Sequence, residues 1–154
     1  MQHQLPADIF VTYFSAYSAH MVEYRGVVYP TVEHAYHCQR YSDETIIAQI
    51  RDARSPFKAW EISQQYKSKQ LPDFNEKKVA VMEELCRAKL EQHDDVRHAL
   101  LESSDLEIVK HISTGPKADG FWDDGEDGMG KNHVGAIWMK LRTEIMTAKY
   151  EHMR

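Results

Sequence analysis

The change from extended to helical patterning at Pro30 is the feature that most constrains how this chain folds. Before it, Ile9–Phe14 and Val22–Tyr29 are rich in β-branched and aromatic residues, and Arg25-Gly26 makes a plausible hairpin turn. After it, apolar residues recur with a helical period. The sequence therefore predicts a mainly α (α+β) fold, multihelical, with a small N-terminal antiparallel β-hairpin or sheet.

The expected helices alternate with short polar loops. They cover Glu44–Arg51, Pro56–Tyr66, about Phe74–Gln92, short segments at Val96–Leu100 and Leu106–Lys110, and a final helix carrying Val134 to Ile145. A chain of 154 residues has the length of one domain. We therefore expect a single domain over residues 1–154, with its core at about 8–150.

Composition bounds the partners and the compartment. The formal net charge of −5 lacks the basic excess of a general nucleic-acid or membrane-surface binder, so a phosphate would have to be held locally. Cys38 and Cys86 lie in apolar helical patterns and are expected to be buried free thiols. With no signal core and no run of about 20 apolar residues, the sequence predicts a cytoplasmic protein without a membrane partner.

The helix that follows Pro30 opens with ionisable groups. Thr31 is placed to cap it, and Glu33, His37 and Arg40 recur at i, i+4 and i+7, which puts them on one face. Glu33 in the first turn is favoured as a carboxylate by the helix dipole. Such a group suits stabilisation of a cationic centre or activation of a water. The alternative is an ordinary first-turn Glu with an i+4 partner.

Six of the seven glycines lie between Gly115 and Gly135. Such a segment lets the backbone approach a ligand, and its exit into a helix offers N–H groups to an anion. Phe121 and Trp122 lie within it without any periodicity. They either fill the core or stack on a ligand.

Familiar metal and nucleotide motifs are incomplete here. Gly125–Lys131 copies the Walker A spacing, but Asn132 stands where Ser or Thr ligates Mg²⁺. A calcium loop starting at Asp123 lacks its bidentate acid. His34 and His37 do not have the zinc-protease spacing. The sequence therefore predicts no metal and no cofactor.

A series of short motifs occurs in a fixed order along most of the chain. They are Phe14-Ser15, Tyr29-Pro30-Thr31-x-Glu33-His34, Gln39, Ser55-Pro56-x-x-Ala59, Val81-Met82, Ala88-Lys89, Leu100-Leu101, Phe121-Trp122-x-x-Gly125, Gly128-x-Gly130-x-Asn132 and Gly135-x-x-x-Met139-x-Leu141-Arg142. In this combination the chain resembles the NADAR family, also called YbiA-like. Members of that family are N-glycosidases.

The resemblance implies a substrate class. Family members hydrolyse the C–N bond of phosphoribosylaminopyrimidine intermediates of riboflavin biosynthesis, and others remove ADP-ribose from modified nucleobases. The expected partner is thus a small phosphoribosyl or ADP-ribosyl substrate, with modified nucleic acid as a further candidate. The alternative from another class is a non-catalytic module that binds ADP-ribose or nucleotide. Glu33 favours the enzyme, because binding an anion needs no carboxylate.

The resemblance also suggests roles for individual residues, with the Glu33 helix and the Trp122 loop meeting over the substrate. The expected catalytic residues are Glu33 and Trp122, and the expected substrate-binding residues are His37, Arg40, Phe74, Asp119, Lys131 and Asn132. Arg40, Lys131 and loop N–H groups around Gly130 and Asn132 would hold the phosphate. His37 would either donate a proton to the leaving base or only pair with Glu33.

Some positions depart from the family pattern. Phe74 stands where the family usually has Trp, Lys110 where it often has Glu, and Asp123 where Trp-Gly is common. Ala16-Tyr17 replaces Asn-Phe after Phe-Ser. These departures bear on substrate identity.

Overall fold

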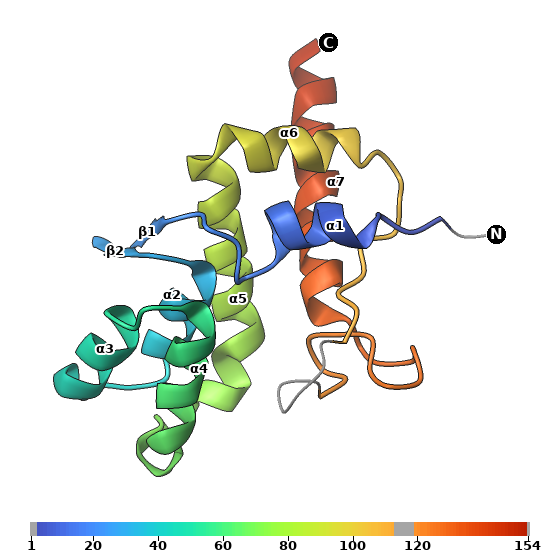
Figure 1. Ribbon diagram of the computed structural model, residues 1–154. Coiled ribbons are helices and arrows are strands. Elements are labelled where there is room, and N and C mark those ends of the chain that lie inside the picture. Colours follow the sequence, from blue (N-terminus) through green and yellow to red (C-terminus); the bar gives the residue numbers. More distant parts are fainter. Residues whose placement is uncertain (1–2, 113–118, 154) are drawn as a thin grey trace. The chain divides into compact units, whose positions relative to one another are not determined.

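The computed structural model describes residues 3–112 and 119–153, so residues 115–118 of the glycine-rich segment lie outside the described ranges. Most described residues are helical, with one small sheet, as predicted (Figure 1). The chain forms two compact units, one of Ala16–His93 and one of Met1–Ser15 with Asp94–Arg154. The single-domain organisation stays a prediction.

The unit Ala16–His93 begins with the predicted hairpin. Strands β1 (Val22–Tyr24) and β2 (Val27–Tyr29) pair antiparallel, with Glu23 opposite Val28. Arg25 and Gly26 both have positive φ, 52° and 81°, as the two central residues of a tight hairpin turn require.

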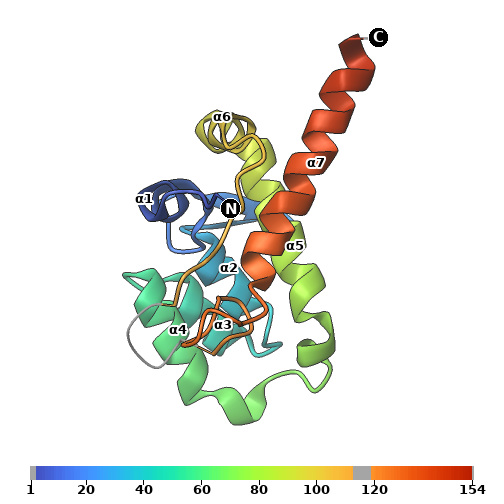
Figure 2. The ribbon, with the colours of Figure 1, turned by 90° about the vertical axis from the view of Figure 1, so that its right-hand side faces the viewer.

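Four α-helices follow in this unit, with a short 3₁₀ turn after the third. They are α2 (Val32–Cys38), α3 (Glu44–Arg51), α4 (Pro56–Gln65) and α5 (Phe74–Gln92), and the 3₁₀ turn is Lys67–Lys69. The predicted extents of the last three helices are confirmed. Helix α2 packs against α3, α4 and α5 (Figure 1 and Figure 2), and all its residues are buried. It is therefore the core helix of the unit, although it carries Glu33 and two histidines.

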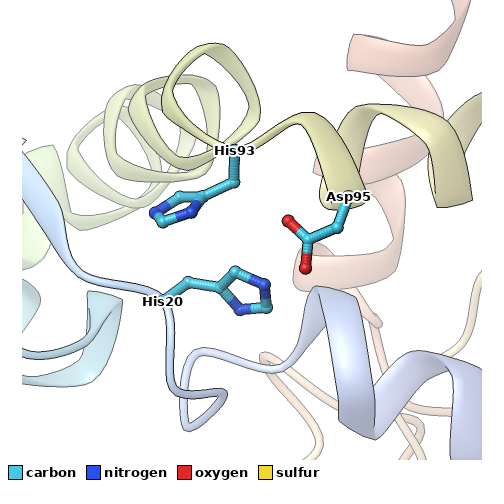
Figure 3. Close-up of side chains that lie close together, drawn as sticks. All are labelled: His20, His93 and Asp95. Carbon is cyan, nitrogen blue, oxygen red and sulfur yellow. The ribbon is translucent and has the colours of Figure 1, made fainter.

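The segment before β1 is fastened to α5 by polar side chains. Lys89 donates from Nζ to Ser18 Oγ at 2.5 Å, and His93 donates from Nε2 to the Met21 carbonyl at 2.6 Å. Figure 3 shows the rings of His20 and His93 close together, and their centroids are 4.8 Å apart. These contacts hold the chain that leads into the hairpin at a fixed place beside α5.

The other unit contains α1 (Ala7–Ile9), the π-helical turn η1 (Phe10–Phe14), α6 (Asp94–Glu102) and α7 (His133–Met153). The prediction that Ile9–Phe14 is extended is wrong. Phe10 and Phe14 are both buried one turn apart, which suits a helix. The Phe14 ring lies 5.0 Å from that of Trp138, whose indole N–H donates to the Phe14 carbonyl at 3.0 Å.

The predicted helix at Leu106–Lys110 is also wrong. Ile108 and Val109 are adjacent and both buried, a pattern that one face of a helix does not favour. The backbone here pairs instead with the N-terminal segment: Glu107 accepts from the Leu5 N–H at 2.8 Å and donates to the His3 carbonyl at 2.9 Å. The segment is therefore extended.

Helix α7 is the longest helix of the described residues, at 21 residues. Trp138 and Leu141 on it are fully buried. Within residues 3–112 and 119–153, no helix combines the length and apolar character needed to cross a bilayer.

Candidate functional site

Glu33 and His37 form a buried pair on α2. Their relative exposures are 5% and 2%, and His37 Nε2 lies 2.8 Å from Glu33 Oε2. One helical turn separates the two residues, so the predicted shared face is confirmed. Burial removes both groups from water, so they do not form a solvated surface pair.

Arg40 extends this pair just past the end of α2. Its Nε–H donates to His37 Nδ1 at 3.0 Å and its NH1 group to Gln70 Oε1 at 2.6 Å. The guanidinium carbon lies 5.4 Å from the centre of the Tyr36 ring and 5.2 Å from that of Phe74, within cation–π range. The half-buried Arg40 side chain is thus held on both its edge and its face.

Phe74 supports this arrangement from the start of α5. It is 3% exposed, and its ring centre lies 5.4 Å from that of Tyr36. The aromatic character of the position is therefore used to pack α2 against α5 beneath Arg40. Direct contact between Phe74 and a substrate stays a prediction.

Two backbone N–H groups in the first turn of α2 are satisfied by residues that precede the helix. The His34 N–H donates to Thr31 Oγ1 at 3.2 Å, which confirms the predicted cap, and the Glu33 N–H donates to the Ala16 carbonyl at 3.0 Å. The segment that carries Ala16 is the one fastened to α5. The backbone at Glu33 is therefore held both by the Thr31 cap and by the segment that precedes β1.

Tyr17 is a polar neighbour of Glu33 that we did not predict. Burial, and then the negative charge of Glu33, raise the pKa of the Tyr17 phenol above its ordinary value. The Tyr17 side chain is thus a neutral hydroxyl at physiological pH, and it lies close enough to Glu33 for the two groups to interact electrostatically. The replacement of the family's Phe by Tyr at this position was the available signal.

Neither cysteine supplies a nucleophile. Burial raises the pKa of both Cys38 and Cys86 to about 12, so each is a protonated thiol at neutral pH. The prediction of buried free thiols is confirmed.

The glycine-rich loop holds Trp122 through a turn built by Asp119. One carboxylate oxygen of Asp119 accepts from the Phe121 N–H at 2.9 Å and from the Trp122 N–H at 3.4 Å. The Trp122 ring lies 4.8 Å from that of Phe121 and 6.3 Å from that of His133. Trp122 is half-buried, in contrast to the fully buried Trp138.

Asp123 is a second organiser of this loop, and we did not predict it as one. Asp123 is only 2% exposed, and its Oδ1 accepts hydrogen bonds from the N–H groups of Gly120 at 2.8 Å and Gly125 at 3.0 Å. The carboxylate that departs from the family pattern therefore folds the loop on itself. The departure from the family pattern at Asp123 does not by itself predict this role.

The predicted backbone anion site in the loop is wrong. The N–H groups from Gly130 to Val134 donate to carbonyls between Gly120 and Asp124, at 2.6 to 3.3 Å. Because these donors are already paired inside the loop, they do not form a ready phosphate cradle.

Asn132 and Lys131 occupy different environments. The Asn132 side chain accepts from the Lys110 N–H at 2.9 Å and donates to the Ile108 carbonyl at 3.0 Å, so it ties the loop to residues 108–110. Lys131 is exposed, with Nζ 5.7 Å from the centre of the Phe121 ring. Of the two, Lys131 has the side chain that is accessible to an anion.

The predicted site residues thus form two sets. The unit Ala16–His93 brings together Glu33, His37, Arg40 and Phe74. The other unit contains Asp119, Trp122, Lys131 and Asn132. Formation of one site by both sets stays a prediction.

The chain is similar to known proteins over nearly its whole length. The family model described as the NADAR domain matches residues 3–146. A protein of Escherichia coli K12 named N-glycosidase YbiA is 32% identical over 136 residues, covering 88% of this chain and 82% of the relative. An N-glycosidase of Nostoc punctiforme is 31% identical over 135 residues, covering 86% and 84%.

Two further comparisons concern a longer protein and a solved structure. A riboflavin biosynthesis protein of Vibrio vulnificus is 32% identical over 120 residues, which are 78% of this chain but 32% of that protein. The NMR structure of E. coli YbiA superposes with a TM-score of 0.79 at 32% identity, covering 90% of this chain and 80% of the other. The mainly helical fold is therefore shared with that structure.

Proposed function

Because this chain belongs to the NADAR domain family, we propose that it is an N-glycosidase that hydrolyses the C–N glycosidic bond of a phosphoribosylated base. The first candidates are the riboflavin-pathway ribosylaminopyrimidine 5′-phosphates, with ribose 5-phosphate as product. The names of the relatives support the reaction class, and that of the Vibrio relative points toward the riboflavin pathway. The observation that carries the proposal is the buried carboxylate of Glu33, held by His37 at 2.8 Å.

In the proposed reaction the bond between the sugar's anomeric carbon and the base nitrogen breaks, and its electron pair leaves with the base. The sugar passes through a state with oxocarbenium character, which a nearby carboxylate stabilises. Water then bonds to the anomeric carbon, and Glu33 accepts a proton from that water. The departing nitrogen takes up a proton from solvent and Glu33 releases the one it accepted, so the products are the free sugar hydroxyl and the N–H base.

We assign the other predicted residues supporting roles in this reaction. Trp122, half-buried at the loop, offers a ring face for stacking on a planar base. Arg40 has N–H groups beyond those bonded to His37 and Gln70, and together with Lys131 it would supply positive charge to the phosphate. Asp119 and Asn132 act by holding the loop that carries Trp122. The mechanism assigns no step to a metal or cofactor.

The test separates substrate classes on the pure protein. A ribosylaminopyrimidine 5′-phosphate and an ADP-ribosylated guanine oligonucleotide are incubated in parallel, and mass spectrometry detects ribose 5-phosphate or ADP-ribose. The Glu33→Gln variant, whose carboxamide fills the same space, is the matched control. Release of ribose 5-phosphate by the wild type alone supports the proposal. Release of ADP-ribose alone changes the substrate, and binding without release of either product rejects the enzyme.

A further inference from the structure

We propose that Arg40 fixes His37 as the neutral Nε2–H tautomer, so that His37 acts as a positioning residue for the Glu33 carboxylate and is not the acid that protonates the leaving base. The catalytic consequence rests on the proposed function. The arrangement of protons does not, and it can be tested without any substrate.

The first step comes from the donor inventory of arginine. A guanidinium carries only donors, and its Nε–H points at His37 Nδ1 with a separation of 3.0 Å. That nitrogen must therefore present a lone pair. A neutral imidazole with an unprotonated Nδ1 carries its hydrogen on Nε2, the atom that lies 2.8 Å from Glu33 Oε2. The direction of both hydrogen bonds follows.

The second step is that Arg40 is itself immobilised. Gln70 accepts from its NH1 group at 2.6 Å, and the aromatic rings of Tyr36 and Phe74 lie against its guanidinium. The backbone closes the same region, because the Leu71 N–H donates to the Arg40 carbonyl at 2.8 Å. A donor held by so many contacts keeps one direction.

The third step is that the surroundings of His37 disfavour any other protonation state of its ring. It is 2% exposed, and its ring packs in a T-shaped arrangement with that of Tyr36, with centroids 5.1 Å apart. A proton added at Nδ1 would face the Arg40 Nε–H, replacing a hydrogen bond with a clash of two donors beside a cation. His37 therefore keeps its one hydrogen for Glu33, and it has none to give to a leaving base.

The consequence for Glu33 is a fixed orientation. A charge-assisted hydrogen bond from the rigid His37 imidazole holds the Glu33 carboxylate, one turn away on α2, in one orientation. The expected effect of losing this donor is on turnover more than on substrate binding.

Activity measurements test the positioning role. His37→Leu removes the donor and should lower kcat about 10- to 100-fold per folded molecule, the scale of one hydrogen bond to a charged group, with KM nearly unchanged. His37→Gln keeps an N–H donor and should recover most of that loss. His34→Leu is the matched control, because His34 is equally buried on the same helix and bonds Thr31 and the Ala53 carbonyl. An equal kcat loss in His34→Leu, or no recovery in His37→Gln, would overturn the positioning role.

Nuclear magnetic resonance tests the tautomer independently. The ring ¹⁵N signals of His37, assigned by their loss in His37→Gln, should report the neutral Nε2–H form at neutral pH. Arg40→Met should introduce the Nδ1–H form or the imidazolium. A wild-type imidazolium, a wild-type Nδ1–H form, or an unchanged tautomer in Arg40→Met would reject the inference. If the wild type hydrolyses no N-glycoside while the Nε2–H form is seen, the proposed function fails and the Arg40–His37 arrangement stands.

Discussion

Helix α2 and the loop from Asp119 to Asn132 both present predicted site residues, but they are built in opposite ways. In α2, the polar side chains bond one another one turn apart, and the backbone is an ordinary capped helix. In the loop, side chains such as Asp123 bond the backbone, and the backbone N–H groups bond other loop carbonyls. In the helix, side-chain spacing brings ionisable groups together, whereas in the loop the polar groups form the hydrogen bonds that fix the backbone conformation.

This difference separates the effects expected from mutation. A change on α2 should act on turnover while the fold persists, because neighbouring helices hold the backbone. A change in the loop backbone should act on stability first, because few elements of regular structure support it.

The largest expected effect is that of Glu33→Gln on turnover. The carboxamide oxygen can still accept from His37, so we expect folding and much of the ligand affinity to persist. Turnover should fall at least ~10²-fold, the scale for removal of a principal acid–base or electrostatic group. Single-turnover kinetics and thermal unfolding measure the two effects separately. Near-normal turnover of Glu33→Gln would show that α2 does not supply the catalytic carboxylate.

Gly135→Ala should reveal how tightly the loop exit is packed. A Cβ there would lie 2.0 Å from the Ile108 carbonyl oxygen and 2.3 Å from Asn132 Nδ2. We expect a loss of about 3 kcal/mol in the free energy of unfolding, measured by urea denaturation. Gly128→Ala is the control, because its φ of 75° is strained but no atom lies within 4 Å, so it should cost only about 1 kcal/mol. Equal losses would mean that crowding at Gly135 is relieved by movement.

Trp122→Ala tests whether the loop contributes a stacking surface. If the half-buried ring stacks on the base, affinity for the base-bearing substrate should weaken by about 1–3 kcal/mol while ribose 5-phosphate binds as before. The melting temperature should change little. Calorimetric titration and thermal unfolding measure both, and Trp122→Phe should retain most affinity because it keeps a ring face.

Trp138→Ala provides the contrast for this measurement. Trp138 is fully buried on α7 and bonds the Phe14 carbonyl. Its truncation should cost about 3–5 kcal/mol of stability. A comparable stability loss in Trp122→Ala with unchanged affinity would make Trp122 a core residue.

The same contrast explains what could be predicted from the sequence. Helical periodicity determines α3, α4, α5 and the facing of Glu33 and His37, with side-chain caps at the starts of α3 and α4, because these features depend on neighbours three or four residues away. The predictions for Ile9–Phe14 and Leu106–Lys110 were wrong because the conformation of these segments depends on partners distant in the sequence, namely Trp138 and the N-terminal segment. The loop carbonyls that occupy the predicted anion-binding N–H groups are likewise invisible to local patterns.

The smallest expected effect is that of Thr31→Ala, which removes the cap of α2 without touching its ionisable face. Thr31 Oγ1 accepts from the His34 N–H at 3.2 Å and bonds His34 Nδ1 at 2.8 Å. Loss of such a cap costs about 1 kcal/mol of stability, whereas Thr31→Ser should cost less because it keeps the hydroxyl. The Glu33 N–H stays bonded to the Ala16 carbonyl, so turnover per folded molecule should stay within about twofold, well under the tenfold that 1.4 kcal/mol on the barrier would produce. Urea denaturation and steady-state kinetics on the three proteins measure these effects. A kcat loss as large as that of Glu33→Gln would show that the cap, and not only the packing of α2, sets the position of the carboxylate.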